Sequence, residues 1–283
     1  MADNGNPKRR RLASALRTLR EEAGISSRPF ADHLGWSQSK VTKTENNRTR
    51  LSPEDVRIWA ETCGAEPARI RELVALAEDL LVEVQTYPTV YRLSGGVAKR
   101  QAEYRRRNEE ATRIAIFQPA VIPGLLQTVD YARHIFMLHG VDAADAAAAA
   151  AARIERQAVV YDQGKTVEFV IAEHVLTRRV APASVMLAQL DRLLALLELP
   201  HPRIGIEPDD AELAAMPVGP FVLREFEDRK MVTVESNAVE VDVSDPVGIA
   251  TYRAAFDGHM KTAVQGRQAA AIVRAAMDKL RNE

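Results

Sequence analysis

The sequence has one cysteine, few aromatic residues and no long apolar run. Its single cysteine, Cys63, excludes an intramolecular disulfide and any metal site built from several cysteines of one chain. No stretch approaches the roughly 18 uninterrupted apolar residues that a membrane span needs, and residues 1–11 lack the apolar segment of a signal peptide. We therefore expect a cytoplasmic protein that does not contact a membrane.

Patterns that carry catalytic or metal chemistry are also missing. The six histidines include no His-Glu-x-x-His pair, and His134 and His139 are five residues apart, a poor helical spacing for one metal ion. Glu173 and His174 could form an acid/base pair, but adjacent residues of a helix point in different directions. There is no Gly-x-Ser-x-Gly motif. The sequence predicts no enzyme, no bound metal and no cofactor.

Charge is distributed unevenly along the chain. The formal net charge is −1, but residues 1–51 contain eleven Lys and Arg against five Asp and Glu, a net charge of +6 that leaves −7 for the remainder. The overall composition, 46% hydrophobic and 27% charged, is that of an ordinary globular protein. A basic N-terminal module on an acidic body is typical of a protein that brings one end to a polyanion.

A helix-turn-helix pattern begins at Phe30. Phe30 and Ala31 lie on the apolar face of a first short helix, and Gly35 stands where a tight turn needs a positive φ. Ser37 then has the position of an N-cap, and Val41 supplies the apolar anchor of a second helix. Two short helices joined in this way are typical of DNA-binding domains.

The exposed side of the second helix and the following turn carry side chains that hydrogen-bond base edges and phosphates. Gln38, Thr42 and Lys43 are the better candidates for base contacts. Arg48 and Arg50 lie beyond the helix and are predicted to contact phosphates. The full set of predicted DNA-binding residues is Ser27, Arg28, Gln38, Ser39, Lys40, Thr42, Lys43, Asn46, Arg48 and Arg50.

Further helices are predicted around this motif. Apolar spacing predicts a helix over residues 10–23, and Ser27 is the expected cap of the next helix. Asn47 can adopt the left-handed conformation that ends the second helix of the motif. Ser52 is expected to cap a fourth helix, and Pro67 opens a fifth.

These features resemble the Xre/Cro-type helix-turn-helix family over about residues 10–80. The resemblance rests on Gly24-Ile25-Ser26, Phe30-Ala31-x-x-Leu34-Gly35, Ser37-Gln38-Ser39-x-Val41 and Glu45-x-Asn47-x-x-x-x-Ser52-Pro53. Known members bind operator DNA, usually as dimers, so the resemblance implies a transcriptional regulator whose recognition helix runs from Ser37 to Asn46. Three positions depart from the family pattern. Ser27 stands where the family commonly has a glutamine that contacts the backbone, Thr44 stands where it commonly has an apolar core residue, and Asn47 replaces a usual glycine.

The C-terminal part is predicted to consist of helices packed on a small, mostly antiparallel sheet. Helices are expected over residues 142–161 and 184–197. Short β runs occur at 167–171, 203–206, 221–223, 231–234 and 239–241, and helices at 252–264 and 268–280 close the chain.

This part resembles the C-terminal domain of the WhiJ-like and Scr1 antitoxin-like regulators of actinomycetes, over about residues 110–275. The motifs are Ile122-Pro123-Gly124-Leu125-Leu126-Gln127-Thr128 with Tyr131-Ala132, Arg153-x-x-Arg156-Gln157, Glu173-x-x-Leu176, Val185-Met186-x-x-Gln189-Leu190, and Gly219-x-Phe221-Val222-Leu223 followed by Val234-Glu235. Members are commonly paired genetically with small partner proteins. The resemblance implies a domain that binds a small partner protein or a signal, and it supplies no established chemistry.

The sequence thus predicts an α+β multidomain protein. Its expected parts are a disordered basic lead-in at 1–9, an all-α five-helix DNA-binding domain at 10–81, a helical linker at 82–115 and an α+β sensing domain at 116–283. The charged helix of the linker is expected to be exposed and laced with i,i+4 ion pairs, or to serve as a second DNA-backbone contact or a dimerisation arm. Arg9, Arg10 and Arg11 could form a minor-groove arm or a solvated lead-in.

Three functions are compatible with this organisation. The first is a transcriptional regulator, with repression as the expected sign, that binds double-stranded DNA as a homodimer and associates with the nucleoid when bound. The second is an antitoxin-like module that sequesters a partner protein and uses DNA binding for autoregulation. The third is a ligand-gated regulator with a small-molecule pocket between the sheet and the helix of residues 186–197.

Overall fold

The computed structural model describes residues 7–49, 51–86, 96–236 and 239–282. The chain divides into two compact units, Met1–Glu83 and Val84–Glu283. Among the described residues, no helix combines the length and apolar character needed to cross a membrane.

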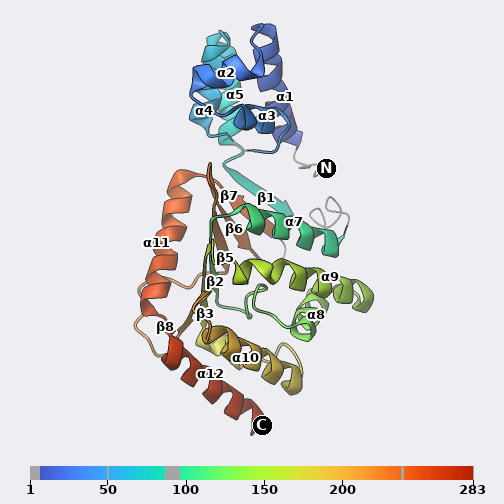
Figure 1. Cartoon of the computed structure of the whole chain (residues 1–283), viewed down its shortest axis with the longest axis vertical. Coiled ribbons are helices and arrows are strands. Elements are labelled where there is room, and N and C mark those ends of the chain that lie inside the picture. Colours follow the sequence, from blue (N-terminus) through green and yellow to red (C-terminus); the bar gives the residue numbers. More distant parts are fainter. Residues whose placement is uncertain (1–6, 50, 87–95, 237–238, 283) are drawn as a thin grey trace. The chain divides into compact units, whose positions relative to one another are not determined.

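The first unit is helical up to Glu78, and strand β1 (Val82–Thr86) begins at its end (Figure 1). Its helices are α1 (Pro7–Glu22), α2 (Ser27–Leu34), α3 (Gln38–Glu45), α4 (Pro53–Thr62) and α5 (Pro67–Glu78). Helix α1 begins at Pro7, so residues 7–9 belong to a helix and not to the predicted disordered lead-in, because proline is well suited to a first helical turn. Residues 1–6 lie outside the described residues. Leu16, Phe30, Trp59 and Leu73 are almost completely buried in one core.

The second unit is built on a mixed sheet. Its strands are β1 (Val82–Thr86), which begins in the first unit, β2 (Arg113–Gln118), β3 (Thr166–Ala172), β4 (Arg203–Glu207), β5 (Phe221–Glu225), β6 (Lys230–Glu235), β7 (Val239–Val243) and β8 (Val264–Gln265), in the spatial order β1-β7-β6-β5-β2-β3-β4-β8. Strand β3 pairs in parallel with both β2 and β4. The pairs β2–β5, β5–β6, β6–β7 and β4–β8 are antiparallel.

Helices cover both faces of this sheet (Figure 1). They are α7 (Val97–Glu110), α8 (Val129–Leu138), α9 (Ala143–Glu155), α10 (Ala183–Leu197), α11 (Pro246–Thr262) and α12 (Gly266–Arg281), with short 3₁₀ helices η1 (Arg156–Tyr161) and η2 (Glu173–Leu176). Ala115 and Phe117 of β2 contribute to the core beneath α11. Ile114 and Ile116 of the same strand join the core on the opposite face, where Leu190 of α10 is fully buried.

The fold class predicted from the sequence, α+β multidomain, is confirmed. The sheet is nevertheless larger than expected, and β4, predicted as part of an antiparallel meander, runs parallel to β3. The physical reason is the connection: α10 joins β3 to β4, and a helical crossover returns the chain to the same end of the sheet. The helix expected over 142–161 ends at Glu155 and continues as η1.

The segment 82–115 is not the helical linker that the sequence predicts. It contains β1, α7 and the start of β2, a strand that the sequence analysis missed. Strand β2 has both faces buried, so it lacks the alternation of polar and apolar residues by which half-buried strands are recognised. Helix α7 is not exposed all round either: Arg100, Tyr104 and Asn108 are buried against the sheet side of the unit.

Candidate nucleic-acid interface

Gly35 and Ser37 set the angle between α2 and α3. Gly35 ends α2 with a φ of 65°, the positive value that the sequence predicts at this turn. The Ser37 hydroxyl accepts the Lys40 backbone N–H at 3.1 Å, which confirms Ser37 as the N-cap of α3. Both ends of the turn are therefore determined by local chemistry.

The start of α2 lies one residue earlier than expected. Ser26 is the N-cap, with extended φ and ψ, and Ser27, the predicted cap, is the first helical residue. This start still places Pro29 in the first turn, where its missing N–H is not needed. The Ser26 side chain makes no capping hydrogen bond, so the first-turn N–H groups are available to an external acceptor such as a phosphate.

A buried aromatic cluster packs against the inner sides of α2 and α3. Phe30 of α2 and Val41 of α3 are fully buried. The Phe30 ring meets the Trp59 ring edge-on, with centroids 4.6 Å apart, and the Trp59 Nε1–H donates to the Leu16 carbonyl at 2.9 Å. This packing holds α2 and α3 against α1 and α4.

A buried ion pair, which the sequence analysis did not identify, fixes the C-terminal end of α3. Arg20 of α1 donates from Nε and Nη2 to the two carboxylate oxygens of Glu45, at 2.5 and 3.0 Å. Its Nη1 donates to the Ile25 carbonyl at 2.7 Å. Both side chains are 10% exposed. This bidentate geometry orients α3 relative to α1 and to the turn that precedes α2.

Thr44 and Asn47, two of the three departures from the family pattern, are both accommodated. Thr44 is buried, and its hydroxyl donates to the Lys40 carbonyl at 2.9 Å, which satisfies the polar group in an apolar setting. Asn47 adopts a φ of 55°, the left-handed conformation predicted for it. The structure therefore explains how each polar residue is tolerated.

Most of the predicted DNA-binding side chains are exposed. The exposed residues are Arg28, Gln38, Ser39, Thr42, Lys43, Asn46 and Arg48, and Ser27 is half-buried. The Asn46 amide is partly engaged, because it donates to the Thr42 carbonyl at 2.8 Å. Arg50 lies outside the described residues.

Lys40 has a different position from its neighbours. Its ammonium lies 3.6 Å from the centroid of the Trp36 ring and 3.3 Å from a carboxylate oxygen of Asp55. These contacts direct the charge toward the start of α4 and leave the side chain 25% exposed. In this conformation Lys40 stabilises the end of the turn and does not point outward with Lys43.

The basic residues before the motif are part of α1. Arg11 donates to Glu72 at 2.8 Å, and Lys8 contacts Asp79 at 2.7 Å, so both connect α1 to the region of α5. Arg9 and Arg10 lie in the same helical turns. A free arm that enters a minor groove is therefore not formed by these residues.

Three motifs of the second resemblance meet at one buried loop. Gln189 of α10 donates to the Leu126 carbonyl at 3.0 Å and accepts the Thr128 N–H at 2.7 Å. Gln157 of η1 donates to the carbonyl of Gln127 at 2.8 Å. Side-chain amides thus satisfy the backbone groups of the loop that leads into α8. These motifs therefore correspond to a structural arrangement in which side-chain amides hold the loop.

Glu173 and His174 are placed as structural residues. His174 Nδ1 lies 3.0 Å from Asp209, and Nε2 lies 2.8 Å from the Pro119 carbonyl. The Glu173 carboxylate accepts the Asp209 N–H at 3.1 Å. The two side chains connect η2 to the segments that follow β2 and β4. Across the described residues, no group of three or more His, Cys, Asp or Glu side chains converges as a metal ion requires.

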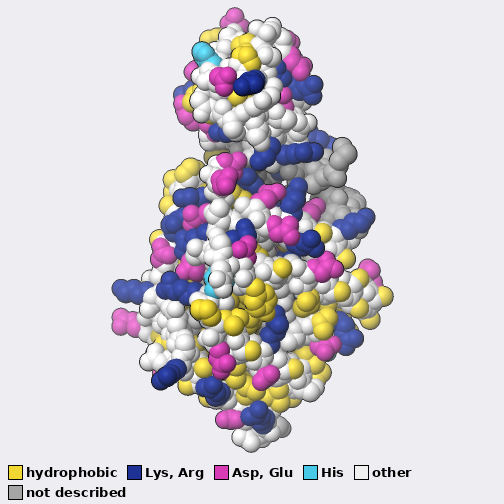
Figure 2. Space-filling model, in the orientation of Figure 1, with side chains coloured by type: hydrophobic (Ala, Val, Ile, Leu, Met, Phe, Trp, Pro, Cys, Tyr) yellow, Lys and Arg dark blue, Asp and Glu magenta, His cyan; other side chains and the backbone are white. Residues whose placement is uncertain are grey.

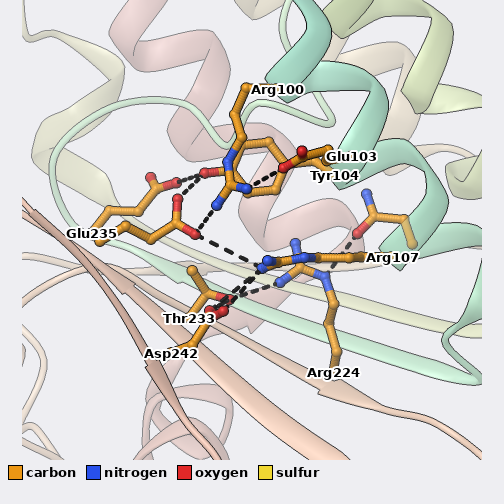
Figure 3. Close-up of polar contacts among 10 residues, drawn as sticks. Arg100, Glu103, Tyr104, Arg107, Arg224, Thr233, Glu235 and Asp242 are labelled. Carbon is orange, nitrogen blue, oxygen red and sulfur yellow. Dashed lines mark hydrogen bonds and ion pairs between the residues drawn. The ribbon is translucent and has the colours of Figure 1, made fainter. Parts of the chain in front are cut away.

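The buried side of α7 forms a polar network with β6 and β7 (Figure 3). Arg100 and Tyr104 both contact the carboxylate of Glu240, and Arg107 lies 3.3 Å from Asp242. Burial raises the pKa of the Glu240 carboxyl and raises that of Tyr104 well above its ordinary value, so the phenol stays neutral. The sequence showed a charged helix but not which side was buried.

Two family comparisons agree with these two units. A model described as a helix-turn-helix domain matches residues 11–73 and supports a DNA-binding regulator. A model described as a domain of unknown function (DUF5753) matches residues 101–275. Searches of curated proteins and of solved structures gave no match. Because the second model covers more than half of the 283 residues, the chain belongs to the DUF5753 family.

Proposed function

We propose that the chain is a sequence-specific transcriptional regulator that reads DNA with α3. The observation that carries this proposal is the exposed row of Gln38, Ser39, Thr42 and Lys43 on a helix held rigidly by the Arg20–Glu45 pair. Amide, hydroxyl and ammonium groups on one helix face match the donors and acceptors of a major groove. Rigid support from the core gives these groups a defined register.

Phosphate contacts are expected to supply most of the affinity. Arg28 at the start of α2 and Arg48 after α3 flank the reading surface and are exposed. The helix dipole adds a partial positive charge at the uncapped start of α2. On the face of the second unit seen in Figure 2, Lys and Arg side chains lie among Asp and Glu side chains. The net charge of +6 over residues 1–51 favours the first unit as the part that binds the polyanion.

The finer assignments belong to the same proposal. A homodimer on an inverted repeat doubles the short sequence that one α3 can read, and it sets the half-site spacing. Membership of the Xre/Cro-type family, repression and a small partner protein for the C-terminal unit are supported by the motifs in the sequence. The antitoxin-like module with autoregulatory DNA binding is the rival function.

Selection from a random DNA library with the full-length protein tests this proposal. One enriched inverted repeat is the expected result. Enrichment of a single, non-repeated site would keep the sequence-specific regulator and reject the dimer. Absence of enrichment, both alone and with lysate of the source organism, would reject base reading by α3 and favour the protein-binding rival.

A further inference from the structure

Arginine side chains gather between α7, η1 and strands β5–β7 of the second unit. Arg100 and Arg107 each reach a carboxylate of β7, through Glu240 and Asp242 respectively. Arg156 of η1 and Arg224 of β5 contact the same buried side of α7, because Arg156 lies over the Tyr104 ring and Arg224 donates to Asn108. Of these four guanidinium groups, those of Arg100 and Arg107 have ion-pair partners on β7.

Arg224 has only neutral hydrogen-bond partners in this cluster (Figure 3). Its Nε donates to the Asn108 side-chain oxygen at 2.9 Å, and its Nη1 donates to the Thr233 hydroxyl at 3.2 Å. The Thr233 hydroxyl in turn donates to Asp242 at 2.9 Å, so Arg224 reaches this carboxylate only through an intermediate group. Arg224 is 3% exposed. Its charge is solvated by dipoles and not by a counterion.

Arg156 is still less well satisfied. Its guanidinium carbon lies 5.1 Å from the centroid of the Tyr104 ring, and its Nε is buried with no hydrogen-bond partner. In the part of the chain that the structure describes, neither Arg156 nor Arg224 lies within ion-pair distance of a carboxylate.

The electrostatics show that these two charges are incompletely compensated, because burial outweighs the effects of Glu235 on Arg156 and of Asp242 on Arg224. Burial and the nearby Arg153 together lower the pKa of Arg156 to about 10. Burial and the nearby Arg107 and Arg156 lower the pKa of Arg224 to about 10 as well. A buried charge without a partner is strongly unfavourable. Two such charges on the buried side of α7 are explained by a counterion from outside the chain.

We propose that Arg156 and Arg224 together bind a phosphate group, free or carried by a small molecule. The two guanidinium groups carry two positive charges, and a phosphate monoester carries about −1.5 to −2 at pH 7. Planar guanidinium groups also match the oxygens of a phosphate in geometry. The Arg156 Nε and the remaining Arg224 donors supply the hydrogen bonds.

Thermal unfolding of the full chain with inorganic phosphate tests this site. Both tryptophans, Trp36 and Trp59, lie in Met1–Glu83, so tryptophan fluorescence reports the first unit and calorimetry reports both. The unfolding transition of the second unit is the one that calorimetry detects and tryptophan fluorescence does not. At constant ionic strength, about 10 mM phosphate should raise the midpoint temperature of this transition by roughly 2–4 °C relative to chloride. An unchanged midpoint, or a shift only in the tryptophan-detected transition, would overturn the proposal. A larger shift with glycerol phosphate would identify a phosphorylated small molecule as the source, and equal shifts would identify free phosphate.

A variant separates binding from a structural role. Arg156→Met removes the uncompensated charge, so without phosphate it should unfold at or above the temperature of the unsubstituted protein, and phosphate should no longer shift it. Arg106→Met, on the exposed side of α7, is the control and should keep the shift. A less stable Arg156→Met protein that still responds to phosphate would overturn the proposal. If this variant does not fold, isothermal titration calorimetry of phosphate into the unsubstituted protein replaces it. Absence of a binding heat in that titration would overturn the proposed phosphate site.

Discussion

At the scale of single residues, a few buried polar side chains determine the position of α3, the helix that we propose to contact DNA. The Arg20–Glu45 pair is the clearest example, because it joins α1 to the end of α3 and is 10% exposed on both sides. Removal of one partner leaves the other charge buried. Arg20→Met should therefore lower the free energy of unfolding of the first unit by about 3–5 kcal/mol, as measured by denaturant unfolding followed by tryptophan fluorescence.

Arg17→Met provides the matched control for this change. Arg17 lies on the same helix, and its pair with Glu21 is more than half exposed on both sides. Exposed pairs of this kind contribute about 0–1 kcal/mol. Equal losses in the two variants would show that the Arg20–Glu45 pair has no special role in holding α3.

Substitution of Lys43 tests whether α3 contacts DNA bases. It is exposed on α3, so Lys43→Ala should leave folding intact and weaken binding at the selected site by about 1–3 kcal/mol, with a much smaller loss on random DNA. Arg48→Ala should weaken binding to all sequences and reduce the slope of log affinity against log salt by about one. Fluorescence anisotropy at several salt concentrations measures both effects. Equal losses for Lys43→Ala on both DNAs would exclude base reading by this residue.

Cys63 provides a pH-dependent observable. Burial raises the pKa of its thiol to about 11, so the thiol form is favoured in the folded state. This stabilisation is complete below the ordinary thiol pKa of about 8.5 and is lost as the pH rises through 11. Alkylation by iodoacetamide at pH 8–9 should be slow in the folded chain and fast in urea. Similar rates in both states at pH 8.5 would contradict the raised pKa.

At the scale of elements, close packing decides where α11 lies on the sheet. A Cβ atom at Gly205 of β4 would lie 2.7 Å from the Cβ of Ala263, just after α11. Because neither atom can rotate away, Gly205→Ala should destabilise the second unit by about 1–3 kcal/mol. Calorimetry measures this loss in the unfolding transition of the second unit, which tryptophan fluorescence does not detect.

Gly219→Ala is the control for that substitution. No atom lies within 4 Å of a Cβ built at Gly219, and its φ is not in the left-handed region. The control should change stability by less than about 0.5 kcal/mol. A destabilisation equal to that of Gly205→Ala would mean that loss of glycine, and not the contact with Ala263, is responsible.

At the scale of the whole molecule, the positions of the tryptophans make the location of DNA binding measurable. A ligand stabilises the unit that it binds. The selected operator should therefore raise the midpoint of the tryptophan-detected transition, since both tryptophans lie in Met1–Glu83. A shift confined to the transition without a tryptophan signal would place DNA binding in the second unit.

Local features of this molecule follow directly from the sequence. Gly35, Ser37 and Asn47 have the conformations that their chemistry predicts, because caps and left-handed residues depend on a few neighbouring atoms. The periodic apolar residues of α10 and α12 also identified these helices. The basic N-terminal unit and the α+β fold class are decided at this level.

Other features depend on contacts between residues far apart in the chain. Strand β2 becomes the centre of the sheet only through β3 and β5, more than 45 and 100 residues away. The direction of Lys40 depends on Asp55, and the Arg20–Glu45 pair joins positions 25 residues apart. Likewise, the charged residues of α7 are visible in the sequence. Which of its arginines form ion pairs with carboxylates of β7 depends on the packing of α7 against β5–β7. The sequence by itself determined the helices, caps and charge of this protein. Tertiary structure decided strand direction and charge pairing, because both depend on distances in space and not on spacing along the chain.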